Sequence, residues 1–269
     1  MQVPSVRAVA PVPRLVSAAL SLSRAREYVL QLTLVFPAIE VVAPGLLLSL
    51  RALLVYAANL LYTAFAYSFN DVEDAEDDAL DPVKGSRNPV SAGLISRRTG
   101  YAISLAFLAA GLALMAALSI ESLVSGSLFS ANAAAYSWHR IRLKAVPILD
   151  LLSHAAALGV PQLTVAYLAF RPPDSTLLAM AVMVALFSMA SQLSQQIRDF
   201  EVDRLAGVRN TTQLLGIRRA KVLMLALLAA ASASYVWLVG TLPIPSACSL
   251  AAPLGVIGPL AYFKAAGRI

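Results

Sequence analysis

Seven carboxylates lie within eleven residues of the sequence, between Asp71 and Asp81. The chain holds fifteen Asp and Glu residues in all, so this segment carries nearly half of its negative charge. Asp71, Asp74 and Asp78 follow one another at spacings of three and four and would form one stripe on a helix, with Asn70 beside them. Like charges repel on such a stripe, and magnesium is the cation that prefers carboxylate oxygens together with substrate phosphates. The spacing therefore predicts a magnesium site; with two His and one Cys in the chain, zinc is disfavoured.

A second acidic segment contains Asp199 and Asp203, which are four residues apart. A shift of 122 residues superposes five identities: Asp77 on Asp199, Asp81 on Asp203, Gly85 on Gly207, Arg87 on Arg209 and Asn88 on Asn210. The match indicates an internal repeat of a four-span unit. Because parallel repeats place equivalent loops on one side of a membrane, we expect the two segments to face one shared site.

Basic residues accompany the acidic segments. They are Lys84, Arg87, Arg209 and the run 139–144, which reads HRIRLK. Lys and Arg beside a magnesium site suit an anionic substrate such as a diphosphate. The remainder of that substrate would meet spans rich in Leu, Ala, Val, Tyr and Phe, so the combination predicts a prenyl diphosphate.

Two polar residues lie inside predicted spans. Asn59 precedes Asn70 by eleven residues, or three helical turns, and so lies below the site on the same face. It either lines a pocket or packs between helices. His154 is better explained as an interhelical hydrogen-bond partner than as a base.

The composition predicts an all-α, polytopic membrane helix bundle. Hydrophobic residues make up 59% of the chain and charged residues 13%, against about 25% charged in soluble domains. Eight apolar segments are candidate spans: about 27–43, 46–69, 100–119, 122–137, 147–169, 175–197, 220–239 and 244–263. Residues 1–26 form a basic lead-in, expected to lie on the surface or to be disordered. Residues 27–269 would be one transmembrane domain with halves at about 27–140 and 147–269.

Charge placement predicts the orientation. With eight spans, nearly all Lys and Arg lie on one side, and only Arg51 and Arg171 lie on the other. By the positive-inside rule the basic side is cytoplasmic. The protein is then a multi-pass cell-membrane protein with its acidic segments facing the cytoplasm, and its net charge of +6 reflects topology rather than a nucleic-acid partner.

Three motifs resemble a known family. Residues 70–78, NDVEDAEDD, match the NDxxDxxxD motif of the UbiA superfamily of membrane prenyltransferases. Residues 195–207, QQIRDFEVDRLAG, are similar to its second Asp-rich motif, and residues 136–150, YSWHRIRLKAVPILD, to its YSxPPxRxK connection. The resemblance covers about residues 24–240.

The resemblance implies magnesium-dependent transfer of a prenyl group from a prenyl diphosphate to a lipophilic acceptor through an allylic carbocation. The implied magnesium ligands are Asn70, Asp71, Asp74, Asp78, Asp199 and Asp203. Of these, catalysis would rest on Asp71, Asp74, Asp199 and Asp203. The predicted substrate-binding residues are Lys84, Arg87, Lys144, Tyr136, Arg26, Arg209 and Asn59. Mg²⁺ is the expected cofactor, membrane lipids surround the protein, and no protein partner is implied.

The sequence departs from the family pattern in places. Asn88-Pro89 stands where Arg-Pro is common, and His139-Arg140 replaces a pair of prolines. The family typically has nine spans rather than eight. The stretch NPVSAG looks most like the branch that includes lycopene elongases.

Two other functions remain open. A terpene cyclase of the same superfamily would use the same metal site without an acceptor. A non-enzymatic transporter is the weaker alternative, because its charged residues would sit near the middle of the spans rather than at their ends.

Overall fold

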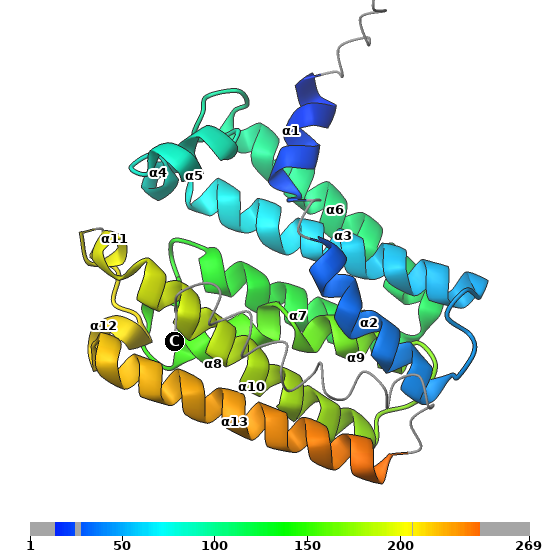
Figure 1. Ribbon diagram of the computed structural model, residues 1–269. Coiled ribbons are helices and arrows are strands. Elements are labelled where there is room, and N and C mark those ends of the chain that lie inside the picture. The colour runs from blue at the N-terminus through cyan, green and yellow to red at the C-terminus, as the bar shows by residue number, and fades with distance from the viewer. Residues whose placement is uncertain (1–13, 25–27, 206, 243–269) are drawn as a thin grey trace, which may run out of the picture.

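The computed structural model describes residues 14–24, 28–205 and 207–242, and every regular element in these ranges is helical (Figure 1). The elements are α1 (Arg14–Leu22), α2 (Tyr28–Val42), α3 (Leu50–Glu73), α4 (Ala75–Asp78), α5 (Pro82–Arg87), α6 (Arg97–Leu118), α7 (Ile120–Ser137), the 3-10 helix η2 (Leu143–Ala145), α8 (Leu149–Ala157), α9 (Val160–Leu168), α10 (Ser175–Arg198), α11 (Phe200–Leu205), α12 (Thr211–Leu215) and α13 (Ile217–Thr241). The predicted all-α class is confirmed.

Five segments of the described chain are long and apolar enough to cross a membrane: α3, α6, the α8–α9 segment, α10 and α13. The predicted spans 27–43 and 122–137 correspond to α2, with 15 residues, and α7, with 18, which do not meet that measure. The predicted span 244–263 lies outside the described residues, as does most of the lead-in. Within the lead-in, α1 forms a helix that packs against α3 and α6.

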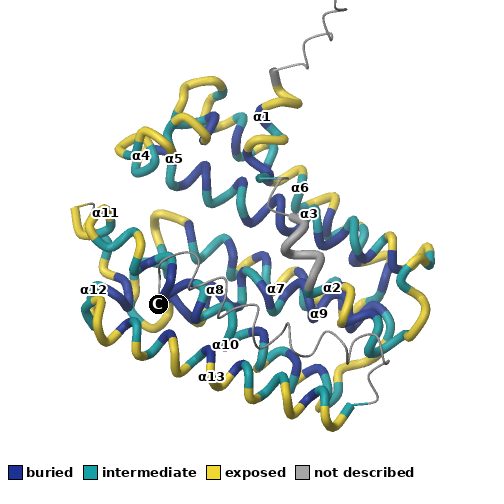
Figure 2. Tube along the Cα trace, viewed as in Figure 1, coloured by how far each residue is buried: buried dark blue, intermediate teal, exposed yellow. Residues whose placement is uncertain are grey.

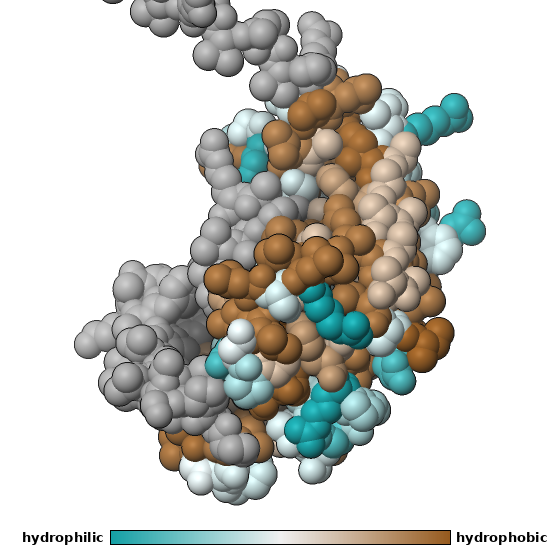
Figure 3. Space-filling model, turned by 90° about the vertical axis from the view of Figure 1, so that its right-hand side faces the viewer, coloured by the Kyte–Doolittle hydropathy of each residue, from teal (hydrophilic) through white to brown (hydrophobic). Residues whose placement is uncertain are grey.

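The long helices pack side by side and bury the faces that they turn to one another (Figures 1 and 2). The largest core cluster joins α2, α3, α9, the C-terminal ends of α6 and α13 and the N-terminal half of α10, and it includes Tyr62 and Tyr167. A second cluster joins α8, α10 and α13 around Leu193 and Met224. Large apolar side chains also cover the outside, among them Leu105 and Leu178, and Figure 3 shows one such apolar face. This distribution suits helices surrounded by lipid.

The segment predicted as one helix over 147–169 is interrupted in its middle, which corrects that expectation. α8 ends at Ala157 and α9 begins at Val160, because Gly159 takes a φ of +105° and Pro161 has no N–H to donate to the carbonyl of Ala157. The hydroxyl of Tyr62, from α3, donates to that carbonyl instead at 2.7 Å.

Side chains also satisfy the other backbone groups at the interruption. Ser188 Oγ, from α10, donates to the carbonyl of Leu158 at 2.8 Å. The N–H of Gly159 donates to Gln162 Oε1 at 2.6 Å, and Gln162 Nε2 donates to Thr63 Oγ1 at 3.2 Å. The discontinuous helix is therefore stable only in contact with α3 and α10.

Arg51 joins three helices at the end of the bundle opposite the acidic segments. Its Nε donates to the carbonyl of Ala169 at 2.5 Å, and its Nη2 donates to the carbonyl of Leu118 at 2.6 Å. Both carbonyls lie at helix C-termini, where a cation is favourable.

Candidate active site

The first acidic segment continues from α3 into α4 through Asp74, whose backbone departs from helical values. α3 ends at Glu73, and the N–H of Asp74 donates to the carbonyl of Asn70 at 2.9 Å. The N–H of Asp78 then donates to the carbonyl of Asp74 at 2.7 Å, so a helical step is kept across the junction with α4. The backbone of Asp74 has φ −87° and ψ 3°.

The second acidic segment repeats this arrangement. The N–H of Asp199 donates to the carbonyl of Gln195 at 2.9 Å, and that of Asp203 to the carbonyl of Asp199 at 2.8 Å. The backbone of Asp199 has φ −92° and ψ 10°. Asp199 therefore corresponds to Asp74 and Asp203 to Asp78, a shift of 125 residues. The predicted register of 122 is wrong for the aspartates.

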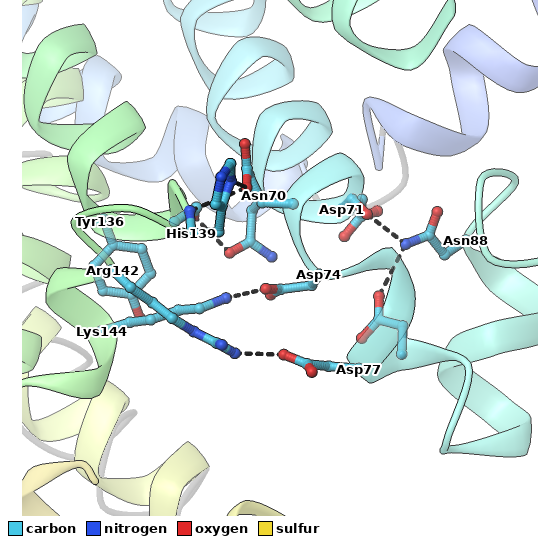
Figure 4. A network of polar contacts seen from close by, with 12 residues as sticks. Asn70, Asp71, Asp74, Asp77, Asn88, Tyr136, His139, Arg142 and Lys144 are labelled. Carbon is cyan, nitrogen blue, oxygen red and sulfur yellow. Dashed lines mark hydrogen bonds and ion pairs between the residues drawn. The ribbon is translucent and has the colours of Figure 1, made fainter. Parts of the chain in front are cut away.

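Two asparagines explain the difference between the registers. Asn88 Nδ2 donates to Asp78 Oδ2 at 3.0 Å and to the carbonyl of Asp71 at 2.6 Å (Figure 4). Asn210 Nδ2 donates to Asp203 Oδ2 at 2.8 Å. These two asparagines are related by the shift of 122, so the first loop is three residues longer between aspartate and asparagine. The two amides thus hold the equivalent carboxylates Asp78 and Asp203 in place.

Each acidic segment is neutralised by cations from other elements. The ion pairs are Arg24–Asp71, Lys144–Asp74, Arg142–Asp77 and Lys84–Asp199. Figure 4 shows Lys144 and Arg142, from the loop between α7 and α8, reaching Asp74 and Asp77. Arg24 was not predicted as a site residue. It lies in the turn just after α1, so the sequence offered no helical pattern that would place it near Asp71.

Lys84 brings the two segments together. It lies on α5, and its Nζ is 3.4 Å from Oδ2 of Asp199, which also pairs with the adjacent Arg198 at 2.7 Å. The short helices α4, α5, α11 and α12 accordingly gather at one end of the bundle (Figure 1). The expected proximity of the two acidic segments is thus present in the structure.

Asp150 is a buried carboxylate that the sequence analysis missed. It lies at the start of α8 with 0% exposure and accepts hydrogen bonds from Gln196 Nε2 at 2.7 Å, the N–H of Thr211 at 2.6 Å, and Thr211 Oγ1. Thr211 follows Asn210, so this network fixes the loop that holds Asp203. The sequence did offer one signal for Asp150, because a single carboxylate near the end of a predicted apolar span indicates a function.

Glu73 fixes the connection between α7 and α8 to α3. Its buried carboxylate accepts hydrogen bonds from Tyr101 Oη at 2.5 Å and from the backbone N–H of His139 at 3.1 Å, while His139 Nδ1 lies 3.0 Å away. The histidine that replaces a family proline therefore holds the loop that carries Lys144.

Burial and charge set the acidity of the aspartates outside the spans. Burial, with the neighbouring Asp199, raises the pKa of Asp203 above its usual value, despite Lys84. Burial, reinforced by Asp74, also raises the pKa of Asp78. At Asp199 burial acts in the same direction, but the contacts with Arg198 and Lys84 leave its pKa below the usual value.

The other predicted site residues occupy varied positions. Asn70 Oδ1 accepts a hydrogen bond from Ser137 Oγ at 2.8 Å, and Tyr136 Oη accepts one from Gln192 Nε2 at 3.0 Å. The carbonyl of Arg87 accepts a hydrogen bond from Ser21, Arg209 is exposed, and Arg26 lies outside the described residues.

Asn59 is buried in the interior. Its Nδ2 donates to the carbonyl of Val55 at 3.0 Å, while its Oδ1 has no hydrogen-bond partner among the described residues. That Asn59 lines a substrate pocket stays a prediction.

The oxygen atoms at this end could hold a hard cation only after the ion pairs open. Among the described residues, no three Asp, Glu, His or Cys side chains converge as a ready cluster. The carboxylates supply hard oxygen donors in both segments, and their present partners are cations that would bind an anion equally well. The residues therefore fit a divalent cation that arrives together with an anionic substrate.

Comparison with known proteins identifies the family of this chain. The model of the UbiA prenyltransferase family matches residues 32–267. The chain is 31% identical over 180 residues to a lycopene elongase/hydratase from Halobacterium salinarum, covering 65% of this chain and 62% of the relative. It is 29% identical over 152 residues to a digeranylgeranylglyceryl phosphate synthase from Thermococcus gammatolerans, covering 56% and 53%. The matches thus span less than two thirds of these relatives.

Solved structures show the same fold. A UbiA homolog from Archaeoglobus fulgidus, bound to GPP and Mg²⁺, superposes with a TM-score of 0.75 at 24% identity, over 91% of this chain and 85% of that one. A homolog from Aeropyrum pernix superposes with a TM-score of 0.73 at 22% identity, over 96% and 91%. With its helical bundle, its paired acidic segments and a family model that spans most of its length, the chain belongs to the UbiA prenyltransferase family.

Proposed function

We propose that this protein transfers a prenyl group from a prenyl diphosphate to a lipophilic acceptor in a magnesium-dependent reaction. The observation that carries the proposal is the Lys84–Asp199 contact, which joins two acidic segments of equivalent local structure at one end of a membrane bundle. The relatives named as prenyl-transferring synthases and the homolog bound to GPP and Mg²⁺ support it.

The proposed metal ligands come from both segments: Asn70, Asp71, Asp74, Asp78, Asp199 and Asp203. Bound Mg²⁺ would withdraw negative charge from the departing diphosphate. The amides of Asn88 and Asn210 orient the carboxylates of Asp78 and Asp203, so these oxygens are held before the metal arrives.

The basic residues would change partners when substrate binds. Lys84 and Lys144 now neutralise Asp199 and Asp74. When a metal occupies the carboxylates, both ammonium groups are released to donate to diphosphate oxygens, with Arg87 and Arg209 nearby in sequence. Donors placed at the leaving group stabilise the charge that develops as the allylic C–O bond breaks.

The apolar interior would hold the prenyl chain and the acceptor. Below the acidic segments the described helices carry mainly Leu, Ala, Val and Phe, which exclude the water that would quench an allylic cation. Lys and Arg concentrate on the side of the acidic segments, which supports a cytoplasmic site. Several relatives are lycopene elongase/hydratases, which favours a carotenoid-like acceptor.

Product analysis tests the proposal. Purified protein in vesicles is incubated with Mg²⁺, dimethylallyl or geranyl diphosphate, and lycopene. Prenylated lycopene would support transfer, and a cyclic hydrocarbon formed from the diphosphate alone would identify a cyclase instead. Full turnover in excess chelator would contradict the magnesium requirement.

Two variants test the site. Asp74→Ala and Asp199→Ala should each lower turnover by about 1,000-fold or more if they hold the metal that stabilises the leaving group. Glu76→Gln and Glu201→Gln are matched controls on the same two segments. Glu76 is an exposed partner of Arg97 and Glu201 an exposed partner of Arg204, and both variants should retain activity. Wild-type rates in both alanine variants would remove the proposed site.

A further inference from the structure

We propose that His154 is the base that accepts the proton lost by the acceptor during prenyl transfer. The inference rests on the function proposed above. The sequence favoured an interhelical hydrogen-bond partner, and the contact of Nδ1 with Ser188 of α10 agrees with that expectation; the proposal concerns the other ring nitrogen. Attachment of a prenyl cation to a neutral alkene acceptor leaves a cationic adduct, which becomes a neutral alkene product by losing a proton. His154 offers an imidazole for this step in the apolar interior, away from the aspartates and lysines at the diphosphate.

The position of His154 suits this role. It lies on α8 four residues after Asp150, which places it about 6 Å deeper in the bundle than the network that holds the second acidic segment. Its ring meets the ring of Tyr136 at 5.9 Å in an edge arrangement. The next residue, Ser137, bonds Asn70 of the first acidic segment. His154 therefore lies just below both segments, where the reactive end of the prenyl chain is expected.

The hydrogen bonds of Ser188 define which ring nitrogen carries the proton. Ser188 Oγ uses its single O–H to donate to the carbonyl of Leu158 at 2.8 Å. His154 Nδ1 lies 3.0 Å from the same oxygen, so the imidazole must donate from Nδ1. A neutral imidazole that is protonated at Nδ1 has its lone pair on Nε2. The interruption between α8 and α9 leaves the carbonyl of Leu158 to accept its hydrogen bond from Ser188. That hydrogen bond thus fixes the tautomer of His154.

Nε2 of His154 makes no hydrogen bond to a described residue, since the ring contact at Ser188 is made by Nδ1. His154 as a whole is 8% exposed. His154 also avoids the outer face of α8, where Leu149 and Leu152 are 44% and 51% exposed. The Nε2 lone pair is thus taken up by no described hydrogen-bond donor, and the ring lies on the side of α8 that faces the bundle.

The reaction balances with this residue as the base. The allylic C–O bond breaks, and its electron pair leaves with the diphosphate. An electron pair of the acceptor forms the new bond to the prenyl carbon. The acceptor then loses a proton to the Nε2 lone pair, and the electrons of the broken bond to hydrogen stay on the product.

The test compares prenylated product with released diphosphate. His154→Asn keeps an amide N–H near the position of Nδ1 and removes the Nε2 lone pair, and His154→Gln is the second variant. With Mg²⁺, dimethylallyl diphosphate and lycopene in vesicles, we expect product to fall by about 100-fold or more. Diphosphate release should fall less, because water captures the cation and prenyl alcohol accumulates. Ser234→Ala, whose hydroxyl bonds only its own helix on the exposed side of α13, is the control.

The same partition can be measured without an acceptor. The cation from geranyl diphosphate either loses a proton to give a hydrocarbon or captures water to give an alcohol, and both histidine variants should shift the products toward alcohol. Ser188→Ala removes the hydrogen-bond partner that fixes the tautomer of His154, and it should shift the products toward alcohol less than the histidine variants do. Magnesium with inorganic diphosphate should raise the melting temperature of His154→Asn as it does for wild type, which shows that the metal site is intact.

An unchanged ratio of product to diphosphate, or equal losses of both, would overturn the assignment of His154. Loss of the stabilisation by magnesium and diphosphate would overturn it too, because the residue would then support the site only structurally. Wild-type protein that releases no diphosphate from either donor would instead overturn the proposed function, on which the assignment rests.

Discussion

The ammonium nitrogen of Lys84 lies 3.4 Å from the carboxylate of Asp199, although 115 residues separate the two in the chain. The contact joins the short helix after the first acidic segment to the end of α10. A lysine that neutralises one carboxylate in the absence of substrate can transfer to a phosphate when a metal takes its place.

Lys84→Met should therefore weaken donor binding. A hydrogen bond between charged groups contributes about 1.5–3 kcal/mol, so we expect KM for the prenyl diphosphate to rise about tenfold or more. Initial rates at varied donor concentration measure the change, with Lys221→Met on α13 as a matched control. A KM within about twofold of wild type would show that Lys84 does not reach the substrate.

Asp150→Asn should destabilise the protein. The amide would turn a donor toward Gln196 Nε2 or Thr211 N–H, which are themselves donors, and a mispaired buried group costs about 1–3 kcal/mol. Adding Gln196→Glu supplies an acceptor to the new amide and should recover part of the loss. Thermal unfolding in detergent follows both variants, and a double variant no more stable than Asp150→Asn would argue against this network.

Asp203→Asn should change the pH dependence of stability in metal-free protein. The pKa of Asp203 is raised by burial and by Asp199, so folding favours its protonated form. That contribution is complete below the unfolded pKa of 3.8 and is lost as pH rises through the folded pKa. The melting temperature of the variant relative to wild type should thus increase from about pH 4 to about pH 7 in chelator. Magnesium should narrow the difference, and a difference independent of pH would contradict the raised pKa.

Arg51→Lys should lower stability without affecting the site. A lysine cannot reproduce the two directed hydrogen bonds to the carbonyls of Ala169 and Leu118, and we expect a loss of about 1 kcal/mol. KM for the donor should stay unchanged because Arg51 lies at the opposite end of the bundle. A normal melting temperature would show that water replaces these contacts without cost.

The sequence predicted the parts of this molecule that repeat a simple pattern. Apolar segments of about 20 residues mark helices, and the spacing of Asp71, Asp74 and Asp78 marks one helix face, since both follow from helical geometry. The spacing also predicted that Asp199 and Asp203 belong to an equivalent segment.

Such patterns could not predict which distant segments contact one another. Asp150 looked like an isolated acid, because its partners Gln196 and Thr211 lie 46 and 61 residues away. The register of the repeat was misjudged because loops change length freely while the helical step through Asp74 and Asp199 is kept. The pairing of Arg24 with Asp71 was not predicted, because a turn after α1 and not a periodic pattern directs this arginine.

The interruption between α8 and α9 has a consequence for how the protein is made. Each half has nine residues, far fewer than the roughly 20 needed to cross a bilayer as a regular helix. The carbonyl of Leu158 finds its partner in Ser188, which leaves the ribosome thirty residues later. We expect this span to enter the membrane incompletely satisfied and to reach its native form only after α10 has been synthesised and inserted beside it.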